Sequence, residues 1–464
     1  MLLLNSRMLD YGLDVRSRLS LLDRLQEKTL TPLIRSSRLH CFRQTLLSED
    51  RARELEHIVA DWHESNHEAP YIRGDVICRD DHVLFLTFGD ASDEEPGLCA
   101  GIIYEPQTKE PLRKLDSFCE LVQESLAVVQ SGSYASLASN VDDVLEWRPA
   151  PSAGQRGLDR LIANLDRDAL TMTVRQESAL VRIRGAEFLE DINARDYLKR
   201  AFQIFNEGSS SHLLASETAS MPDFSVERMV SAGLLKREVL VSCRKTGHTI
   251  FRLPSADALA VVTVSEATCS ECGMLIADEK VEDAHTPTRL ATALLEDGSW
   301  LVTRIHALLR ELGLPESEIA IAPTKGDGNA HLMANVCGES FLFVLRDGHL
   351  TPNVARRAID LSLETQATHL VVIATGTIQN EGRVRLLEYA GRRARGGEEL
   401  TVHILQGAGA ATIELQEVFE RVSQEVIARH LCELDANIGF DLSRMIINRS
   451  QLLHKTSLAL VASS

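Results

Sequence analysis

The sequence predicts a multidomain protein that combines α+β and α/β architecture. Its 464 residues fit about three domains at roughly 150 residues each. Hydrophobic residues make up 44% and charged residues 25% of the chain, which is the composition of a folded protein with a buried core. The hydrophobic pattern also changes along the chain, from helices with a β-hairpin to an alternating α/β layer. We therefore expect domains at residues 1–148, 158–284 and 285–464.

The N-terminal domain is expected to contain helices and a β-hairpin. Apolar residues recur at helical spacing within 8–66 and again within 115–129. Between these segments, 83–88 and 98–104 have strand composition and are separated by an acidic loop. A stretch rich in Pro, Gly and Ser at 149–157 predicts a linker to the next domain.

The middle domain begins with a helical block at 158–206 and continues with a helix, a turn and two strands at 225–260. Ser225 is a candidate N-cap, and Gly233 is a candidate left-handed residue at the end of that helix. This order of helix, Ala-Gly-Leu-Leu, basic residues and hairpin resembles the end of a winged-helix domain. The alternative interpretation is an ordinary helix followed by an ordinary hairpin.

A cysteine pair follows the hairpin in the run Cys269-Ser-Glu-Cys272-Gly273. Two thiolates at this spacing can bind one tetrahedral ion, and a closed structural site needs two more ligands. Cys243 and His248 flank the four-residue hairpin turn, so we expect them to lie opposite each other. The sequence therefore predicts a zinc-ribbon-like site with a structural zinc ion bound by Cys243, His248, Cys269 and Cys272. The alternative is a pair of reduced cysteines without a metal.

The C-terminal domain is predicted to be an α/β layer that starts at Lys325-Gly-Asp327-Gly-Asn329. Two strands around a tight turn follow, then a helix at 351–365, a strand at 369–376, a basic helix at 381–395 and a strand at 400–405. This order, and the Gly-Asp-Gly-Asn before a hairpin, resembles the Mrr-type restriction endonuclease-like fold over roughly residues 320–425.

The resemblance implies a site for a divalent ion, but this chain lacks part of its signature. In that family an Asp begins the hairpin, and Glu/Gln-x-Lys at the end of its second strand completes a Mg²⁺ site. Asp327 matches the Asp, whereas the tripeptide reads Leu345-Arg346-Asp347. We therefore favour a catalytically silent binding module. The alternative is a rearranged catalytic site of Asp327, Glu339 and Asp347, with positive charge from Lys325 or Arg346.

Arginines concentrate on two predicted helices of this domain. They are candidates for contacts with nucleic-acid phosphates, and because the formal net charge is -18, any such contact must be local. The alternative is a solvated face, since Glu381 and Glu388 interrupt the basic residues. The arginines are Arg356 and Arg357 on the first helix and Arg383, Arg385, Arg392, Arg393 and Arg395 on the second.

The nine cysteines and the apolar runs indicate the compartment. The cysteines are odd in number and widely scattered, which favours a reducing cytoplasm over a disulfide framework. Apolar runs such as 98–104, 258–264 and 370–374 have the length of strands and fall short of the ~20 residues of a membrane span. We expect a cytoplasmic protein without a membrane partner.

Together these features lead to a functional expectation that rests on the resemblance. It implies a nucleic-acid-associated, catalytically inactive nuclease-like subunit of a bacterial antiviral defence or DNA-processing system, binding DNA or RNA beside a partner ATPase or nuclease subunit. The first alternative is an active metal-dependent nuclease with the rearranged site. The second is a protein-interaction scaffold of a defence complex without nucleic-acid contact, which the acidic net charge favours.

Overall fold

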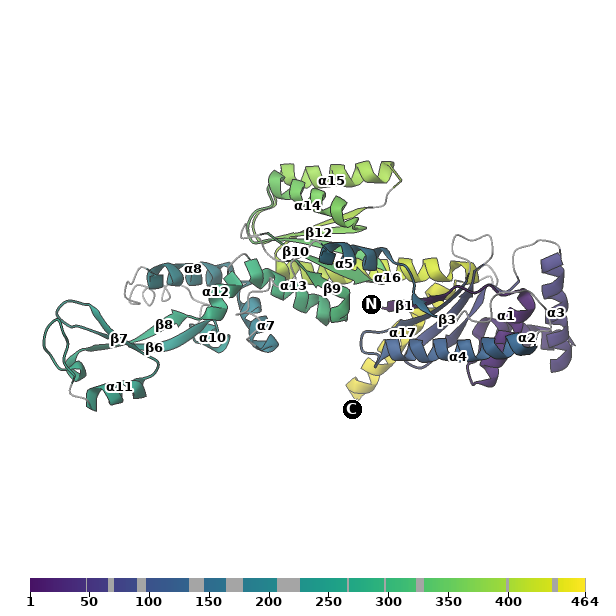
Figure 1. Cartoon of the computed structure of the whole chain (residues 1–464), viewed down its shortest axis with the longest axis horizontal. Coiled ribbons are helices and arrows are strands. Elements are labelled where there is room, and N and C mark those ends of the chain that lie inside the picture. The colour runs from purple at the N-terminus through teal and green to yellow at the C-terminus, as the bar shows by residue number, and fades with distance from the viewer. Residues whose placement is uncertain are drawn as a thin grey trace.

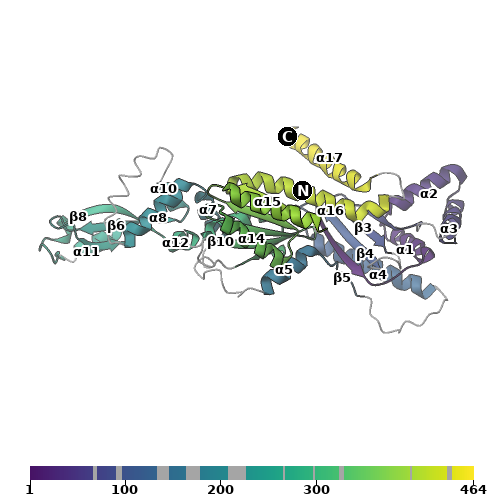
Figure 2. The same ribbon diagram turned by 90° about the horizontal axis from the view of Figure 1, so that it is seen from above.

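The computed structural model shows an elongated, mixed α+β protein with three separate sheets among the described residues (Figure 1). In both views the three-stranded sheet lies at one end, the N-terminal helices lie at the other, and a mixed sheet lies between them (Figures 1 and 2). The structure describes residues 1–46, 48–65, 71–89, 97–132, 146–163, 178–206, 226–264, 267–295, 298–322, 329–397, 400–435 and 441–463.

The N-terminal region contains a five-stranded antiparallel sheet in the order β2-β3-β4-β1-β5. The predicted hairpin is confirmed as β3 and β4, whereas β1, which pairs with β4, was not predicted. The strands are β1 (Leu3–Leu9), β2 (Gly74–Cys78), β3 (His82–Phe88), β4 (Leu98–Tyr104) and β5 (Arg148–Pro149). The helices are α1 (Val15–Glu27), α2 (Leu33–Leu46), α3 (Glu49–Ser65) and α4 (Pro111–Gly132).

The middle region contains a second sheet in the order β7-β6-β8. The predicted helix and hairpin are confirmed as α10, β6 and β7, and Gly233 ends the helix with a φ of 75°. Ser225 lies outside the described residues. The elements are α5 (Ala153–Ala163), α7 (Ala179–Phe188), α8 (Ile192–Asn206), α10 (Val226–Ser231), β6 (Leu235–Ser242), β7 (Thr249–Leu253), α11 (Ala256–Val264), η1 (Ile276–Asp278) and β8 (Lys280–Pro287).

Two segments of this region differ from the expectation. The apolar run 258–264 belongs to helix α11 and not to a strand, and Leu259 and Val262 pack from this helix onto the small core beside the hairpin. The predicted linker 149–157 runs into α5, whose Leu158 and Leu161 are buried against the mixed sheet.

The third sheet has the order β13-β12-β11-β10-β9. Strands β9, β10 and β11 are antiparallel, whereas β11, β12 and β13 are parallel. The strands are β9 (Ile319–Ile321), β10 (Asn329–Val336), β11 (Glu339–Arg346), β12 (His369–Ala374) and β13 (Thr401–Gln406). The helices are α12 (Arg289–Leu295), α13 (Ser299–Glu311), η3 (Glu316–Glu318), α14 (Pro352–Thr365), α15 (Asn380–Arg395), α16 (Ala408–Asp435) and α17 (Leu442–Ser463).

Helices cover both faces of the mixed sheet, as Figure 1 shows. Because successive strand residues point to opposite faces, Leu342 and Val344 of β11 pack toward α5, α14 and α15. Phe341, Phe343 and Leu345 of the same strand pack toward α13 and α16. The sheet therefore has a buried apolar layer on each side.

The core on the α16 side continues into the N-terminal sheet. Phe85 of β3 and Phe343 of β11 belong to one continuous buried cluster. At ~1.5 Å per residue, the 28 residues of α16 span about 42 Å, and this helix also contacts β1. The boundaries 1–148, 158–284 and 285–464 stay a prediction.

Residues 235–287 form what we call the tip module, the sheet β7-β6-β8 with α11 and η1. Its outer end has a small core of its own, in which the buried residues are Val241, Cys243, Cys269 and Ile276. Among the described residues, no helix combines the length and apolar character that a membrane span requires.

Candidate functional site

Four metal-ligating side chains converge at the outer end of the tip module. The ligand atoms of Cys243, Cys269, Cys272 and Glu279 all lie within 4.8 Å of one another. Cys243 follows β6, the other two cysteines lie between α11 and η1, and Glu279 lies between η1 and β8. Cys243, Cys269 and Glu279 are buried, and Cys272 is half-buried.

The structure brings together the three predicted cysteines but not His248. The side chain of His248 is exposed, and Glu279 completes the group in its place. The β6–β7 hairpin has a register shift between Val241 and Ser242. Beyond this shift Ser242 pairs with Thr249, and the N–H of Cys243 donates to the carbonyl of His248 over 2.8 Å, so the two residues lie opposite each other as expected. His248 is nevertheless not part of the clustered group.

Hydrogen bonds organise this cluster in its protonated state. Cys272 Sγ donates to Glu279 Oε1 over 2.8 Å, and the N–H of Arg244 donates to Oε2 over 2.7 Å. The bond to Glu279 raises the pKa of the Cys272 thiol to about 12 and lowers the pKa of the carboxyl. The hydroxyl and N–H of Thr246 lower the pKa of Cys243 to about 7. A cation that bound here would displace the shared proton.

The donor set and its spacing fit zinc. Thiolate and carboxylate are both zinc ligands, and a tetrahedral site with Zn–S bonds of about 2.3 Å has ligand atoms about 3.8 Å apart. The four atoms, already within 4.8 Å, would close around the ion by about 1 Å or less. A metal also meets a structural need, since small cores are commonly stabilised by disulfides or metals. Among the described residues, the remaining buried members of this core are Val241 and Ile276.

The end of β11, where the resemblance places Glu-x-Lys, contains no open cation site among the described residues. Leu345 is buried in the core. The two oxygens of Asp347 are engaged: Oδ1 accepts from Thr375 Oγ1 over 2.8 Å, and Oδ2 accepts from Trp300 Nε1 over 3.3 Å. Arg195 of α8 places its Nε 3.8 Å from Oδ1 and stacks on the ring of Trp300.

The two predicted catalytic carboxylates that the structure describes, Glu339 and Asp347, are not brought together. Asp327 and Lys325 lie outside the described residues. Glu339 begins β11 and forms an ion pair with Arg429 at 2.9 Å, whereas Asp347 follows the other end of the strand. Eight strand residues span about 26 Å at ~3.3 Å each, so Glu339 and Asp347 cannot bind one ion.

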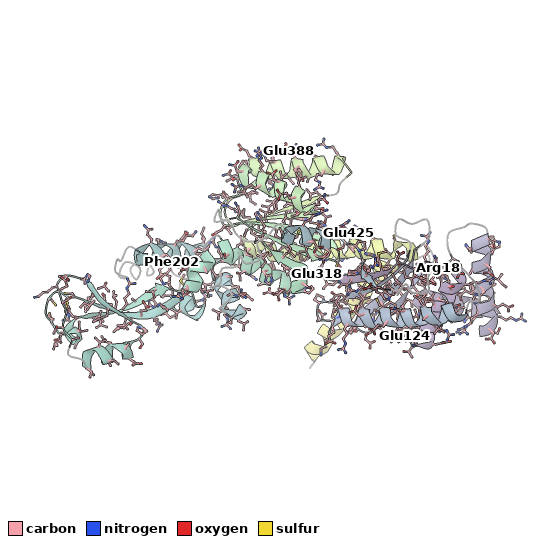
Figure 3. The ribbon with its side chains drawn as sticks, in the orientation of Figure 1. Arg18, Glu124, Phe202, Glu318, Glu388 and Glu425 are labelled. Atoms are coloured by element: carbon pink, nitrogen blue, oxygen red, sulfur yellow. The ribbon has the colours of Figure 1, made fainter. Side chains whose placement is uncertain are left out.

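The predicted arginines lie on α14 and α15, the helices that cover one face of the mixed sheet (Figure 1). Among the described residues, the guanidinium groups of Arg356, Arg383 and Arg392 have no hydrogen bond or ion pair. Glu388 is also exposed on the outer side of α15 (Figure 3). Arg356, Arg357, Arg383, Arg385, Arg392 and Arg395 are exposed, and Arg393 is half-buried.

Two of these arginines are fixed by local contacts. Arg385 donates to the carbonyl of Pro352 at the start of α14 over 3.2 Å, which joins the two helices. Arg395 donates to the carbonyl of Gly391 over 3.0 Å near the C-terminus of α15. The exposed cationic surface therefore continues from α15 onto α14.

Comparison of the chain with protein-family models, with curated proteins and with solved structures gives no match. Sequence reasoning missed Glu279, and it also missed Arg195, Trp300 and Thr375 as partners of Asp347. Nothing local marks the last three, because they come from separate elements that only the fold brings together. For Glu279 the sequence contains an indirect signal. Both cysteine turns have the spacing Cys-x-x-x-Gly, but the first has Thr246 where the second has Cys272, so one ligand has to come from another segment.

Proposed function

We propose that this chain is a nucleic-acid-associated subunit whose nuclease-like domain is catalytically inactive. The observation that carries the proposal is the exposed arginine surface on α14 and α15, in which Arg356, Arg383 and Arg392 have no partner among the described residues. Cations that are exposed and not neutralised locally are suited to phosphate contacts. The two helices carry seven arginines against four acidic residues, within a chain of net charge -18.

The arrangement around this surface supports the nuclease-like part of the proposal. An antiparallel hairpin, a helix, a parallel strand, a basic helix and a second parallel strand follow in the order on which the resemblance rests. The pairing of Asn329 with Arg346 places the end of β11 beside the start of β10, where the family holds its ion.

The contacts at the end of β11 support inactivity. A nuclease of this type needs open carboxylates for Mg²⁺ and a cation near the attacking water. Here Leu345 is buried, and the carboxylate of Asp347 is occupied by Trp300, Thr375 and Arg195. Opening this carboxylate would leave buried donors unpaired, which costs about 1–3 kcal/mol for each group.

The proposal includes a structural zinc ion in the tip module and a cytoplasmic location beside a partner ATPase or nuclease subunit. A zinc-stabilised module at one end of an elongated molecule is suited to presenting a surface to a partner. This part rests on the cysteine cluster and on analogy with proteins of similar modular composition.

Nucleic-acid binding is tested with the full chain and fluorescently labelled DNA and RNA, single- and double-stranded. We expect binding that weakens steeply with salt. The Arg356→Ala/Arg383→Ala/Arg392→Ala variant should reduce the slope of log K against log[salt] by about 2 to 3 for duplex DNA, at ~0.9 per phosphate contact. The matched control is Arg16→Ala/Arg24→Ala/Arg113→Ala, which removes three exposed arginines from the N-terminal region.

The same samples test the other functions. Incubation with Mg²⁺ or Mn²⁺ should leave the nucleic acid intact. Cleavage that Asp327→Ala abolishes would instead establish an active nuclease. Absence of binding by the wild type, or equal loss in both triple variants, would contradict the proposal and favour the scaffold.

A further inference from the structure

The two turns that carry the cysteines of the tip module have the same backbone structure. In the first, the N–H of Cys243 donates to the carbonyl of His248 over 2.8 Å, and the N–H of Gly247 donates to the carbonyl of Cys243 over 2.8 Å. In the second, the N–H of Cys269 donates to Met274 over 2.7 Å, and the N–H of Gly273 donates to Cys269 over 2.9 Å.

The glycine occupies the same place in both turns. Gly247 has a φ of 72° and Gly273 a φ of 75°, in the left-handed region that glycine adopts without strain. Each turn therefore begins with a cysteine, turns back at a glycine four residues later and closes with a backbone bond at the next residue. The tip module contains one metal-binding knuckle in two copies.

The copies differ at the fourth position. The second turn has Cys272 there, which supplies a thiolate beside Cys269, whereas the first turn has Thr246. The Oγ1 of Thr246 accepts the N–H of His248 over 3.4 Å inside the turn. Thr246 is not a ligand, because zinc sites in proteins use Cys, His and carboxylate groups.

Glu279 fills the position that this difference leaves open. Its Oε1 lies 2.8 Å from Cys272 Sγ, and its Oε2 accepts the N–H of Arg244, the residue after Cys243, over 2.7 Å. One oxygen thus faces the sulfurs while the other is anchored to the first knuckle. The carboxylate is buried, and a buried carboxylate requires a compensating partner.

We propose that the tip module binds one zinc ion through Cys243, Cys269, Cys272 and Glu279, with Thr246 at the place of a fourth cysteine. This inference deepens the zinc part of the proposed function and rests on it, but it is independent of nucleic-acid binding. It assigns the fourth ligand to the residue directly before β8 and thereby connects the start of the module's third strand to the metal. His248 has no part in the site.

Metal titration of the full chain, after removal of bound metal with a chelator, tests this assignment. We expect one Co²⁺ per chain with the spectrum of a tetrahedral thiolate site, and zinc that displaces it. Glu279→Gln should weaken zinc binding by more than the roughly 10- to 100-fold typical of losing an outer-shell partner. Glu271→Gln, the exposed acid of the same turn, is the charge-matched control and should bind as the wild type does.

The gain-of-ligand variant makes the test independent of damage to the fold. Adding Thr246→Cys to Glu279→Gln should restore tight zinc binding and raise the S→Co²⁺ charge-transfer band, because the band grows with the number of thiolates. His248→Ala should change neither quantity. The assignment is overturned if Glu279→Gln binds zinc as the wild type does, if His248→Ala loses zinc, or if Thr246→Cys fails to restore binding.

Nucleic-acid binding by the same variants separates this inference from the proposed function. If Glu279→Gln loses zinc but binds nucleic acid with unchanged salt dependence, the result supports the metal assignment alone. A wild type that binds zinc through these four residues but no nucleic acid overturns the proposed function and leaves the metal assignment standing.

Discussion

The mixed sheet buries apolar side chains on both of its faces, whereas the outer end of the tip module has, among the described residues, a core of four buried side chains. On β11 alone, Phe341, Phe343 and Leu345 face one apolar layer while Leu342 and Val344 face another. In the tip module, Val261 and Val264 of α11 remain 75% and 84% exposed. Ordering each residue costs about 1–2 kcal/mol of backbone entropy. Two buried aliphatic side chains, worth about 1.5–3 kcal/mol each, offset this cost for only a few residues of the outer end.

With the proposed zinc ion bound, the two regions are stabilised by different interactions. Apolar packing holds the mixed sheet, so its stability should depend on the volume and shape of core residues. Under the proposed zinc assignment, metal coordination holds the tip module, so its stability should depend on four ligand atoms and on the availability of the ion.

The largest expected effect is loss of the metal ligands. Cys269→Ser/Cys272→Ser removes two thiolates, and structural zinc sites contribute about 10 kcal/mol or more in zinc-finger peptides. We expect bound zinc to fall from one per chain to none by elemental analysis, with new proteolytic cleavage confined to residues 235–287. A double variant with wild-type resistance to proteolysis would show that the metal does not hold the module.

A core substitution in the mixed sheet should lower the free energy of unfolding and leave the zinc content unchanged. Phe341 stacks on His369 at 4.2 Å and meets Phe419 edge-on at 4.9 Å between ring centres. Phe341→Ala should reduce the free energy of unfolding by about 3–5 kcal/mol, measured with denaturant, while zinc content stays at one per chain. Phe251→Ala on β7, where the ring is 37% exposed, is the control and should cost less than about 0.5 kcal/mol.

Acid should destabilise the mixed sheet through His369. Burial lowers the pKa of this ring from 6.5 to about 4, so the folded state favours the neutral form. The unfolded chain takes up the proton first, so the contribution is full above pH 6.5 and is lost as the pH falls toward 4, by about 3 kcal/mol. His369→Phe keeps a ring against Phe341 and should show a shallower loss in urea melts over this range. Equal slopes for both proteins would contradict this explanation.

The smallest effect is expected at Asp347. Asp347→Ala leaves the buried donors of Trp300 and Arg195 without this partner, and we expect a loss of about 1–3 kcal/mol in the free energy of unfolding. Because this carboxylate is not available to an ion, the variant should bind nucleic acid with the wild-type salt slope. A change in cleavage or in metal dependence would instead indicate a catalytic role.

Much of the mixed sheet could be predicted from sequence, because local patterns determine it. The hairpin of β10 and β11, the helices α14 and α15 and the strands β12 and β13 all have clear periodicity and turn residues.

The strand β8 of the tip module has no such pattern, since its sequence Lys-Val-Glu-Asp-Ala-His-Thr-Pro is that of an exposed edge strand. Only pairing with β6 makes it a strand.

The metal centre could be predicted in part for the same reason. The Cys-x-x-Cys pair and the cysteine at the end of β6 are local signals, and all three lie in the cluster. Glu279 follows another acid in an ordinary polar stretch, and its role depends on how η1 turns the chain back toward Arg244. The choice of His248 rested on its place opposite Cys243, which the backbone confirms, but His248 is exposed and is not among the clustered ligands.

Hydrogen exchange of the full chain with and without a zinc chelator measures directly whether the metal stabilises the tip module and not the mixed sheet. We predict that the chelator removes amide protection in β6, β7 and β8 at the outer end of the tip module and leaves β10, β11 and β12 protected. Protection that persists in both regions after the metal is removed, or that is lost in both together, would contradict the account.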